Sequence, residues 1–241
     1  MNIYESLRSQ LLDMIEANQW QDEMIDIVYA RPLSAEEAIG RPDRDDYPIL
    51  VGKEVILETE FKGAKGQAFT DQPGSFSGTL QDVVNLPLNS NYRRAVFIAT
   101  LNAVLRYMGK IGHTVHCKDD APGKCGLAIV NYVKEHYGQP KIAFIGYQPA
   151  LISALVKEFD LRATDLNPDN VGKKTLGVLI EPVSKTEEVL EWADIIIATG
   201  STVVNGSIVK YLEKKPALFY GITVAGAAYL NGWQTFCPYS K

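Results

Sequence analysis

The chain has 241 residues, of which 46% are hydrophobic and 22% are charged, a balance typical of a globular protein with one large domain or two smaller ones. Its formal net charge of −5, with no long cluster of Lys or Arg, disfavours a nucleic-acid partner, because phosphate binding requires a concentrated basic face. Three cysteines argue against a disulfide framework, the first residues lack a signal-peptide pattern, and no segment approaches the roughly 18 uncharged apolar residues of a membrane span. We therefore expect a cytoplasmic protein without a nucleic-acid or membrane partner.

The first half of the chain predicts a small α+β domain. Ile3, Leu7, Leu11, Met14 and Ile15 fall at helical spacing and predict a helix with one buried stripe. Strand patterns follow at 24–30 and within 50–61, and the Gly-, Pro- and Ser-rich stretch 63–80 predicts a strand between turns. Residues 91–109 have the length and periodicity of a buried helix. Strands that lead into a long helix without alternation predict an α+β domain over residues 1–112.

The second half of the chain predicts a parallel sheet. From residue 138 onward, short apolar strands at 141–145, 160–165, 174–182, 194–200 and 216–223 alternate with helical patterns. Continuous apolar strands separated by helices are typical of a parallel sheet covered on both faces. The predicted fold class is therefore α/β, with a Rossmann-like doubly wound domain over residues 138–241 and a connecting segment over residues 113–137.

Two strand ends in this sheet carry candidate binding residues, since ligands bind beyond the carboxyl ends of parallel strands. Gly146, in the turn "IGYQPAL", allows close backbone approach, although the turn is not a full GxGxxG motif. Asp165 follows 19 residues later, about the spacing at which an acidic residue reaches a ribose hydroxyl. A helix cap or a turn in "DLNPDN" explains Asp165 equally well.

The stretch "ATGSTVVNGSI", residues 198–208, is the most specific in the chain. It brings Thr199, Gly200, Ser201 and Thr202 to the end of a strand, followed by Asn205. Hydroxyls and exposed amides at a strand-to-helix turn can hold an anion or a carboxylate. Helix capping and an Asn-Gly turn would explain part of the pattern. The number of small and polar residues favours a binding loop.

Several segments together resemble the bacterial and archaeal heavy-metal chelation domain family. These are "FIATLNAVL", "IGYQPAL" and "DIIIATGSTVVNGSI", and the later "YGITVAGAAYLNGW" is similar to that family's carboxyl-terminal segment. The resemblance implies an enolase amino-terminal-like domain joined to a Rossmann-like domain, with a site in the cleft between them. With Gln148 and Asp165 added, the ligand-binding residues expected there are Asn102, Gly146, Gln148, Asp165, Thr199, Gly200, Ser201, Thr202 and Asn205.

The segment "HTVHCKDDAPGKC", residues 113–125, is a second candidate site. His116, Cys117 and Cys125 could bind a transition or heavy metal ion, since imidazole and thiolate suit soft or borderline metals. Adjacent ligands such as His116 and Cys117 do not point the same way, so the spacing does not match a structural zinc site. The alternatives are a plain connecting loop and, if Cys117 and Cys125 meet, a redox pair. Cys237 is expected to be a bystander.

These observations lead to one main functional hypothesis and one alternative. The main hypothesis is a protein that binds a small anionic ligand or a heavy-metal chelate in the cleft between its two domains, with enzymatic activity left open. The alternative is an enzyme that uses NAD or S-adenosylmethionine, motivated by Asp165 after Gly146 and by the Rossmann-like order. A homo-oligomeric state is also left open.

Overall fold

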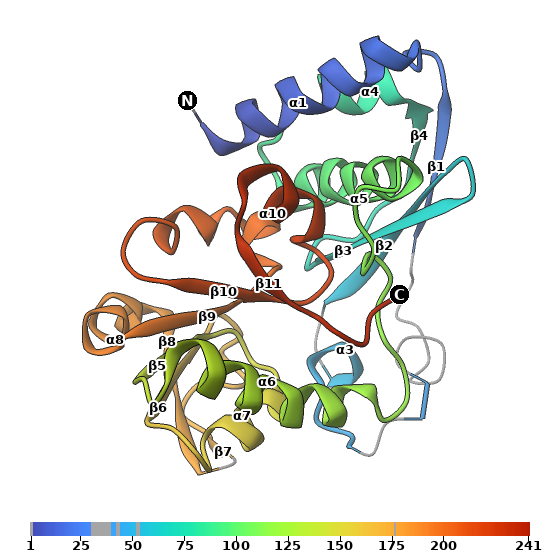
Figure 1. Cartoon of the computed structure of the whole chain (residues 1–241). Coiled ribbons are helices and arrows are strands. Elements are labelled where there is room, and N and C mark those ends of the chain that lie inside the picture. Colours follow the sequence, from blue (N-terminus) through green and yellow to red (C-terminus); the bar gives the residue numbers. More distant parts are fainter. Residues whose placement is uncertain (1, 30–39, 42–43, 52–53, 176) are drawn as a thin grey trace.

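One long helix lies between an antiparallel sheet and two helices that belong to a second, mostly parallel sheet (Figure 1). The computed structural model describes residues 2–29, 40–41, 44–51, 54–175 and 177–241. The elements of the first part are α1 (Ile3–Asn18), β1 (Met24–Tyr29), α3 (Pro48–Val51), β2 (Val55–Phe61), β3 (Ala64–Thr70), β4 (Phe76–Thr79), α4 (Leu80–Asn85) and α5 (Asn91–Tyr107).

The first sheet is antiparallel, with the strand order β3-β2-β1-β4. Helix α1 begins with a capping box, in which the Asn2 and Glu5 side chains satisfy free N–H groups of the first turn. Its buried residues are Leu7, Leu11 and Ile15, so the predicted apolar stripe is confirmed. The likeness of this part to the amino-terminal domain of enolase stays a prediction.

The second sheet has seven strands in the order β11-β10-β9-β5-β6-β8-β7. All neighbouring pairs are parallel except β7 with β8. The elements of this part are α6 (Ala121–Tyr137), β5 (Ile142–Ile145), α7 (Pro149–Leu155), β6 (Leu161–Asp165), β7 (Lys174–Thr175), β8 (Val178–Pro182), η1 (Val183–Lys185), α8 (Thr186–Trp192), β9 (Ile195–Thr199), α9 (Thr202–Asn205), η2 (Ser207–Lys210), β10 (Ala217–Tyr220), α10 (Ala225–Asn231) and β11 (Gln234–Phe236).

The six parallel strands follow the order of a doubly wound sheet and confirm the predicted α/β class. The chain starts at the centre with β5, builds outward through β6 and β8, and then returns to build β9, β10 and β11 on the other side. Successive residues of β5 face opposite ways: Ile142 and Phe144 pack with α6 and α7, and Ala143 and Ile145 pack toward the core that includes α5. The order reverses between β5 and β9, where such sheets bind ligands beyond their carboxyl edge.

Helix α5 is the common core of both parts. Every residue from Ala95 to Leu105 is buried, because β2 and β3 cover one side of the helix while α9 and α10 cover another. Its side chains belong to one continuous apolar cluster with residues of both sheets, including Leu57 of β2 and Phe219 of β10. Among the described residues, no helix combines the length and the apolarity that a membrane crossing requires.

Helix α6 differs from the expected connecting segment. The segment "KDDAPGK" predicts a turn, but a 17-residue helix starts at Ala121, inside it. Pro122 lies in the first helical turn, where proline is tolerated because the N–H it lacks would have no partner there. Gly126 packs within 2.7 Å of the carbonyl oxygen of Ala150 in α7, measured from the position a Cβ atom would take, so α6 and α7 lie very close together. Cys125 is therefore a helical residue.

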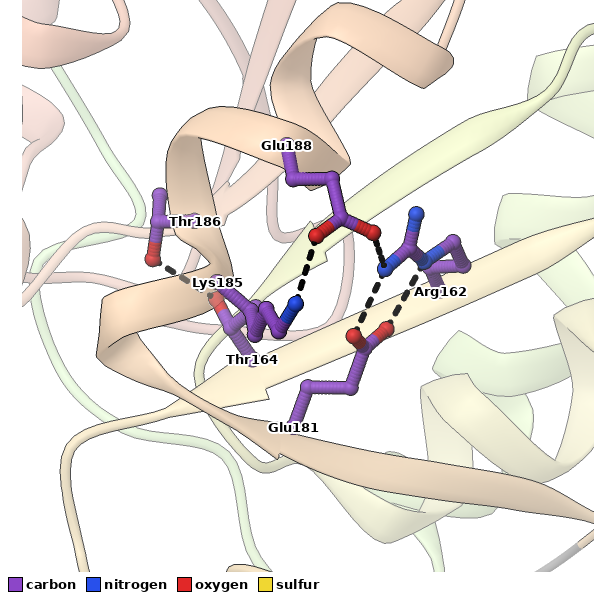
Figure 2. A network of polar contacts seen from close by, with 6 residues as sticks. All are labelled: Arg162, Thr164, Glu181, Lys185, Thr186 and Glu188. Atoms are coloured by element: carbon purple, nitrogen blue, oxygen red, sulfur yellow. Dashed lines mark hydrogen bonds and ion pairs between the residues drawn. The ribbon is translucent and has the colours of Figure 1, made fainter.

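A network of ion pairs braces the β6–β8 side of the parallel sheet (Figure 2). Arg162 on β6 donates to both carboxylate oxygens of Glu181 on β8, at 2.8 and 2.6 Å, and to Glu188 of α8 at 2.8 Å. Lys185 donates to the other oxygen of Glu188 at 2.7 Å. Two cations therefore balance two carboxylates, and the forked geometry ties two strands to a helix.

Candidate functional site

Four strand ends converge at the carboxyl edge of the parallel sheet, and Gly146 is where they approach most closely. Its φ of 95° favours glycine, and a Cβ atom at this position would lie 2.8 Å from Cγ2 of Thr199 and 3.0 Å from the hydroxyl of Tyr220. The backbone at the end of β5 thus contacts side chains from the ends of β9 and β10. The side chains of Thr199 and Tyr220 thus occupy the space next to Gly146, where the sequence predicts a close approach to the backbone.

The predicted binding loop divides into an outer and an inner part. Thr199 and Ser201 are half-buried, and their hydroxyl oxygens lie 3.2 Å apart at the edge of the sheet. Thr202 is 1% exposed and donates its hydroxyl to the carbonyl of Thr199 at 2.7 Å. Gly200 faces Val224 at 3.0 Å from the position of a Cβ atom. The hydroxyls of Thr199 and Ser201 therefore remain at the edge, whereas Thr202 is turned into the fold.

Asn205 and Gln148 are engaged in local structure. The side-chain oxygen Oδ1 of Asn205 accepts from the backbone N–H of Ser207 at 2.9 Å and from the Ser207 hydroxyl at 2.7 Å, which forms an Asx turn. The carbonyl just before it, that of Val204, accepts from Arg94 of α5, so this end of the loop packs on α5. Gln148 caps α7, since its side chain accepts from the N–H of Leu151 at 2.8 Å.

Asn102 ties the two parts of the molecule together from the middle of α5. It is completely buried, and its amide nitrogen donates to the carbonyl of Gln67 in β3 at 3.0 Å and to those of Ile222 and Thr223 after β10. Its carbonyl accepts from the N–H of Gly226 at 2.8 Å. Both ends of this amide are occupied by backbone groups, so Asn102 is placed as a brace. Its role as a ligand contact stays a prediction.

Acidic side chains from both sheets gather at the carboxyl edge. Glu54 directly precedes β2, Asp71 directly follows β3 and Asp165 ends β6. The pKa of Glu54 is raised to about 7, first because the surrounding protein desolvates its carboxyl, and then because of the charges of Asp165 and Asp71. The residue as a whole nevertheless keeps an accessible surface, so water and small solutes can reach it. Among the described residues, these three carboxylates form no ion pair.

Asp165 and Tyr220 extend this acidic group along the strand ends. Burial raises the pKa of Asp165, although its carboxylate accepts from the N–H of Asn167 at 2.9 Å and from the amide of Asn170 at 3.0 Å. The pKa of Tyr220 lies well above its usual value because the phenol is buried and because Asp165 and Glu54 are near. The phenol therefore stays protonated, and it donates to the backbone carbonyl of Ile145 at 3.3 Å. No sequence pattern indicates Glu54, because the carboxylates near it lie on other elements.

All three cysteines gather at the opposite end of the same edge. The Cys125 thiol of α6 donates to the sulfur of Cys117, which lowers the pKa of Cys117 and raises that of Cys125. Cys237 follows β11, and its sulfur accepts from the N–H of Gly221, just after β10. Burial raises the pKa of Cys237 to about 11, and the charge of Cys117 raises it further, so the third thiol lies near Cys117. The expectation that Cys237 is a bystander stays a prediction.

Backbone pairing brings these distant cysteines together. Lys241 exchanges two hydrogen bonds with Val115, at 2.8 and 2.9 Å, which lays the segment after β11 alongside the segment that leads into α6. No sequence pattern predicts this pairing, because the two segments are more than a hundred residues apart.

His116 packs against an aromatic ring, and its buried imidazole has a lowered pKa. Burial lowers its pKa to about 4, and its ring lies edge-on against Phe69, with 5.4 Å between the ring centroids. Its Nδ1 atom has no hydrogen-bond partner among the described residues. Within that same part of the chain, no three His, Cys, Asp or Glu side chains come together in a group able to hold a metal ion. The expected role of His116, Cys117 and Cys125 as metal ligands stays a prediction.

Comparison with known proteins relates the second part of the chain to one family. Residues 130–226 match the model of the DUF364 family, which is described as "Putative heavy-metal chelation". Over these residues the chain is similar to the DUF364 family. They contain β5, β6, β9 and β10, and therefore most of the carboxyl edge. No curated protein matches the chain.

Two solved structures of DUF364 proteins of unknown function resemble the chain. One, from Pyrococcus horikoshii, is 16% identical with a TM-score of 0.57, over 92% of this chain and 79% of that one. Another, from Desulfitobacterium hafniense, is 17% identical with a TM-score of 0.48, over 73% of this chain and 72% of that one. The first likeness extends beyond the residues that match the family and establishes a shared fold, which by itself assigns no activity.

Proposed function

We propose that the protein binds a metal cation carried by a small organic chelator at the carboxyl edge of its parallel sheet. The observation that carries this proposal is the meeting of Glu54, from the antiparallel part, with Asp165, from the parallel sheet, without a compensating cation among the described residues. A bound positive charge would offset the burial that raises the pKa of both carboxyls and the charge of Asp165 that adds to the shift at Glu54. The family description, heavy-metal chelation, is consistent with a cationic ligand.

The same charges argue against the anionic ligand that the loop sequence favours. An anion at this edge would meet the field of Glu54, Asp71 and Asp165. The helices that follow the strand ends are also short, with seven residues in α7 and four in α9, and so provide little dipole to offset that field. A complex with net positive charge fits the edge better, with the half-buried hydroxyls of Thr199 and Ser201 placed to bind the polar groups of the chelator.

A chelated ion fits these residues better than a bare ion. Among the described residues no group of three metal-binding side chains is assembled, so the protein does not present a ready coordination shell. A metal that arrives with most of its ligands already in place needs from the protein only charge and shape. The proposed role of Glu54 and Asp165 is therefore to contact the outside of the complex and to balance its charge.

Thermal unfolding in the presence of defined complexes tests this proposal. Nickel or cobalt complexes of histidine or ethylenediamine, which are neutral or positive, should raise the melting temperature, whereas the corresponding citrate and EDTA complexes, which are negative, should not. Glu54→Gln and Asp165→Asn should each reduce the stabilisation, and Glu213→Gln, a matched change of an exposed carboxyl with no ion pair among the described residues, should leave it intact. If negative complexes stabilise best, or if both edge variants respond like the unaltered protein, the proposal is wrong.

The cofactor-dependent alternative gains no support. The turn after β5 continues as Tyr147, Gln148 and Pro149, so the second and third glycines of a dinucleotide motif are missing.

A further inference from the structure

We infer that Trp20, Phe61 and Tyr107 form an aromatic cage for a small ligand with a methylated ammonium group, and that the side chain of Lys62 fills this cage until the ligand binds. The cage lies at the end of β2, whereas Glu54 lies just before its start. It therefore uses none of the residues of the proposed chelate site, and the two proposals can succeed or fail independently.

The first argument is the arrangement of the three rings. Trp20 follows α1, Phe61 ends β2 and Tyr107 ends α5, so three separate elements bring one ring each to the same place. The ring centroids lie 5.1 to 5.5 Å apart, and the ring planes cross steeply, at 62° to 82°. Three rings in mutually crossed planes enclose a corner instead of forming a stack.

The second argument is the cation that lies in this corner. The Nζ atom of Lys62 lies over all three rings, at 5.2 Å from the centroid of Trp20, 5.6 Å from that of Phe61 and 5.8 Å from that of Tyr107. The negative faces of the rings therefore attract positive charge to one point, the arrangement by which aromatic cages recognise quaternary ammonium ligands. The Glu23 carboxylate lies 2.8 Å from the same nitrogen and adds a negative charge to the site.

The third argument is the size of the corner. A methyl carbon contacts a ring at about 3.5–4.0 Å and its nitrogen lies one bond further away, so a methylated nitrogen sits roughly 5 Å from each ring. The distances around Nζ of Lys62 are of this size. A primary ammonium is strongly hydrated and has three N–H donors, whereas a quaternary ammonium has none to satisfy. The cage therefore suits a methylated cation better than it suits the lysine.

The fourth argument is that Lys62 can leave the cage. Lys62 and Gly63 form the two-residue loop between β2 and β3, with φ values of 50° and 81°, as in a type I′ hairpin turn. The side chains of Lys62 and Glu23 are 30% and 43% exposed, so their ion pair lies near the surface and costs little to break. A Cβ atom at Gly63 would meet nothing within 4 Å, so the space beside the turn is open.

The test is a titration of the full chain with choline, followed by proton NMR of the ligand methyl groups, which the ring faces should shift upfield. Ethanolamine, which lacks the methyl groups, and 3,3-dimethylbutan-1-ol, the neutral carbon isostere of choline, should bind at least 10-fold more weakly. Lys62→Asn should bind choline about 10-fold more tightly than the unaltered protein, because a cage that is open about one tenth of the time loses affinity by that fraction. Asn tolerates the positive φ of this position, so the turn should be kept.

Matched variants distinguish the cage from the surrounding surface. Lys65→Gln, which removes another ion-paired lysine of the same hairpin, should bind choline like the unaltered protein. Tyr107→Leu in the Lys62→Asn background should abolish the upfield shift, whereas Tyr229→Leu, at an exposed tyrosine of α10, should preserve it. Circular dichroism checks that each variant is folded.

Three outcomes would overturn the inference. One is that Lys62→Asn does not bind choline, and another is that the carbon isostere binds as tightly as choline does. The third is that Glu54→Gln or Asp165→Asn loses choline while Tyr107→Leu keeps it, which would assign the cation to the acidic edge of the parallel sheet.

Discussion

Charged side chains along β6 and β8 form ion pairs, whereas the carboxylates at the carboxyl end of β6 form none among the described residues. Along β6 and β8, Arg162 and Lys185 meet Glu181 and Glu188 in a network where each charge has a partner (Figure 2). Asp165 ends the same strand, and its charge contributes to the raised pKa of Glu54. Neither carboxylate forms an ion pair among the described residues. Paired charges hold elements together, whereas carboxyls whose pKa is raised by burial and that have no ion-pair partner are candidates for a binding site. The comparison therefore separates a structural brace from a functional edge.

The same contrast applies to polar side chains. Asn102 lies in the most buried part of the molecule, but four backbone groups satisfy its amide. Thr199 and Ser201 lie at the edge and bond mainly to each other. The Asn102 amide therefore holds backbone segments together, while the half-buried Thr199 and Ser201 hydroxyls lie at the edge.

The largest expected effect is at Asn102. Asn102→Ala should destabilise the protein by about 3 kcal/mol, because it leaves buried carbonyls and the N–H of Gly226 without partners. Asn231→Ala, which removes an exposed amide that donates to Ala227 at 2.8 Å, should cost less than about 1 kcal/mol. Urea unfolding of both variants measures the difference. Equal effects would mean that Asn102 is not a brace.

A smaller loss of folding stability is expected when the ion-pair network around Arg162 is broken. Arg162→Met should destabilise the protein by about 2 kcal/mol, since Glu181 is left without its forked partner in a partly buried position. Adding Glu181→Met should restore part of this stability, because the unpaired charge is removed. Chemical denaturation of the single and double variants gives the coupling. A double variant that is less stable than Arg162→Met would contradict the assignment of the cost to the unpaired charge.

At the carboxyl edge of the sheet, removing a charge is expected to stabilise the protein. The ordinary pKa of Glu is 4.5 and that of Glu54 is about 7, so as pH rises through this window the unfolded chain releases the proton first and the folded state loses stability. Glu54→Gln should therefore stabilise the protein at pH 8, by about 1 kcal/mol after solvent screening, and should change little at pH 4. Melting temperatures at the two pH values test this.

A cationic chelate should follow the same titration. Its affinity for the unaltered protein should rise as pH increases through about 7, where Glu54 becomes charged beside Asp165 and Asp71, and should stay flat for Glu54→Gln. A ligand that binds more tightly as pH falls would reverse the proposed sign of the edge.

The elements that the sequence predicts well are those whose pattern is local. The apolar runs of β5, β9 and β10 identify a parallel sheet, because strands buried on both faces contain few polar residues. Helix α6 escapes prediction, since Asp120, Pro122 and Gly123 are typical of a turn as well as of a helix start. Strand β11 has three residues and is too short for a periodic signal.

The candidate site is only partly readable from the sequence because its residues come from distant elements. Gly146, Asp165 and Thr199 follow strands and can be placed at the edge by the rule for parallel sheets. Glu54 precedes a strand of the other sheet, and Cys237 joins Cys117 through the pairing of Val115 with Lys241. Such neighbours depend on how the two parts pack, which no local pattern encodes.

The burial of α5 has a consequence for how the protein unfolds. Because its side chains complete the cores of both sheets, separating the sheets would expose an apolar surface on each, and neither would keep a closed interior. Heat or denaturant should therefore melt the whole molecule in a single cooperative transition. A fragment that begins after this helix would lack the surface that covers one face of its sheet, and we expect it to aggregate.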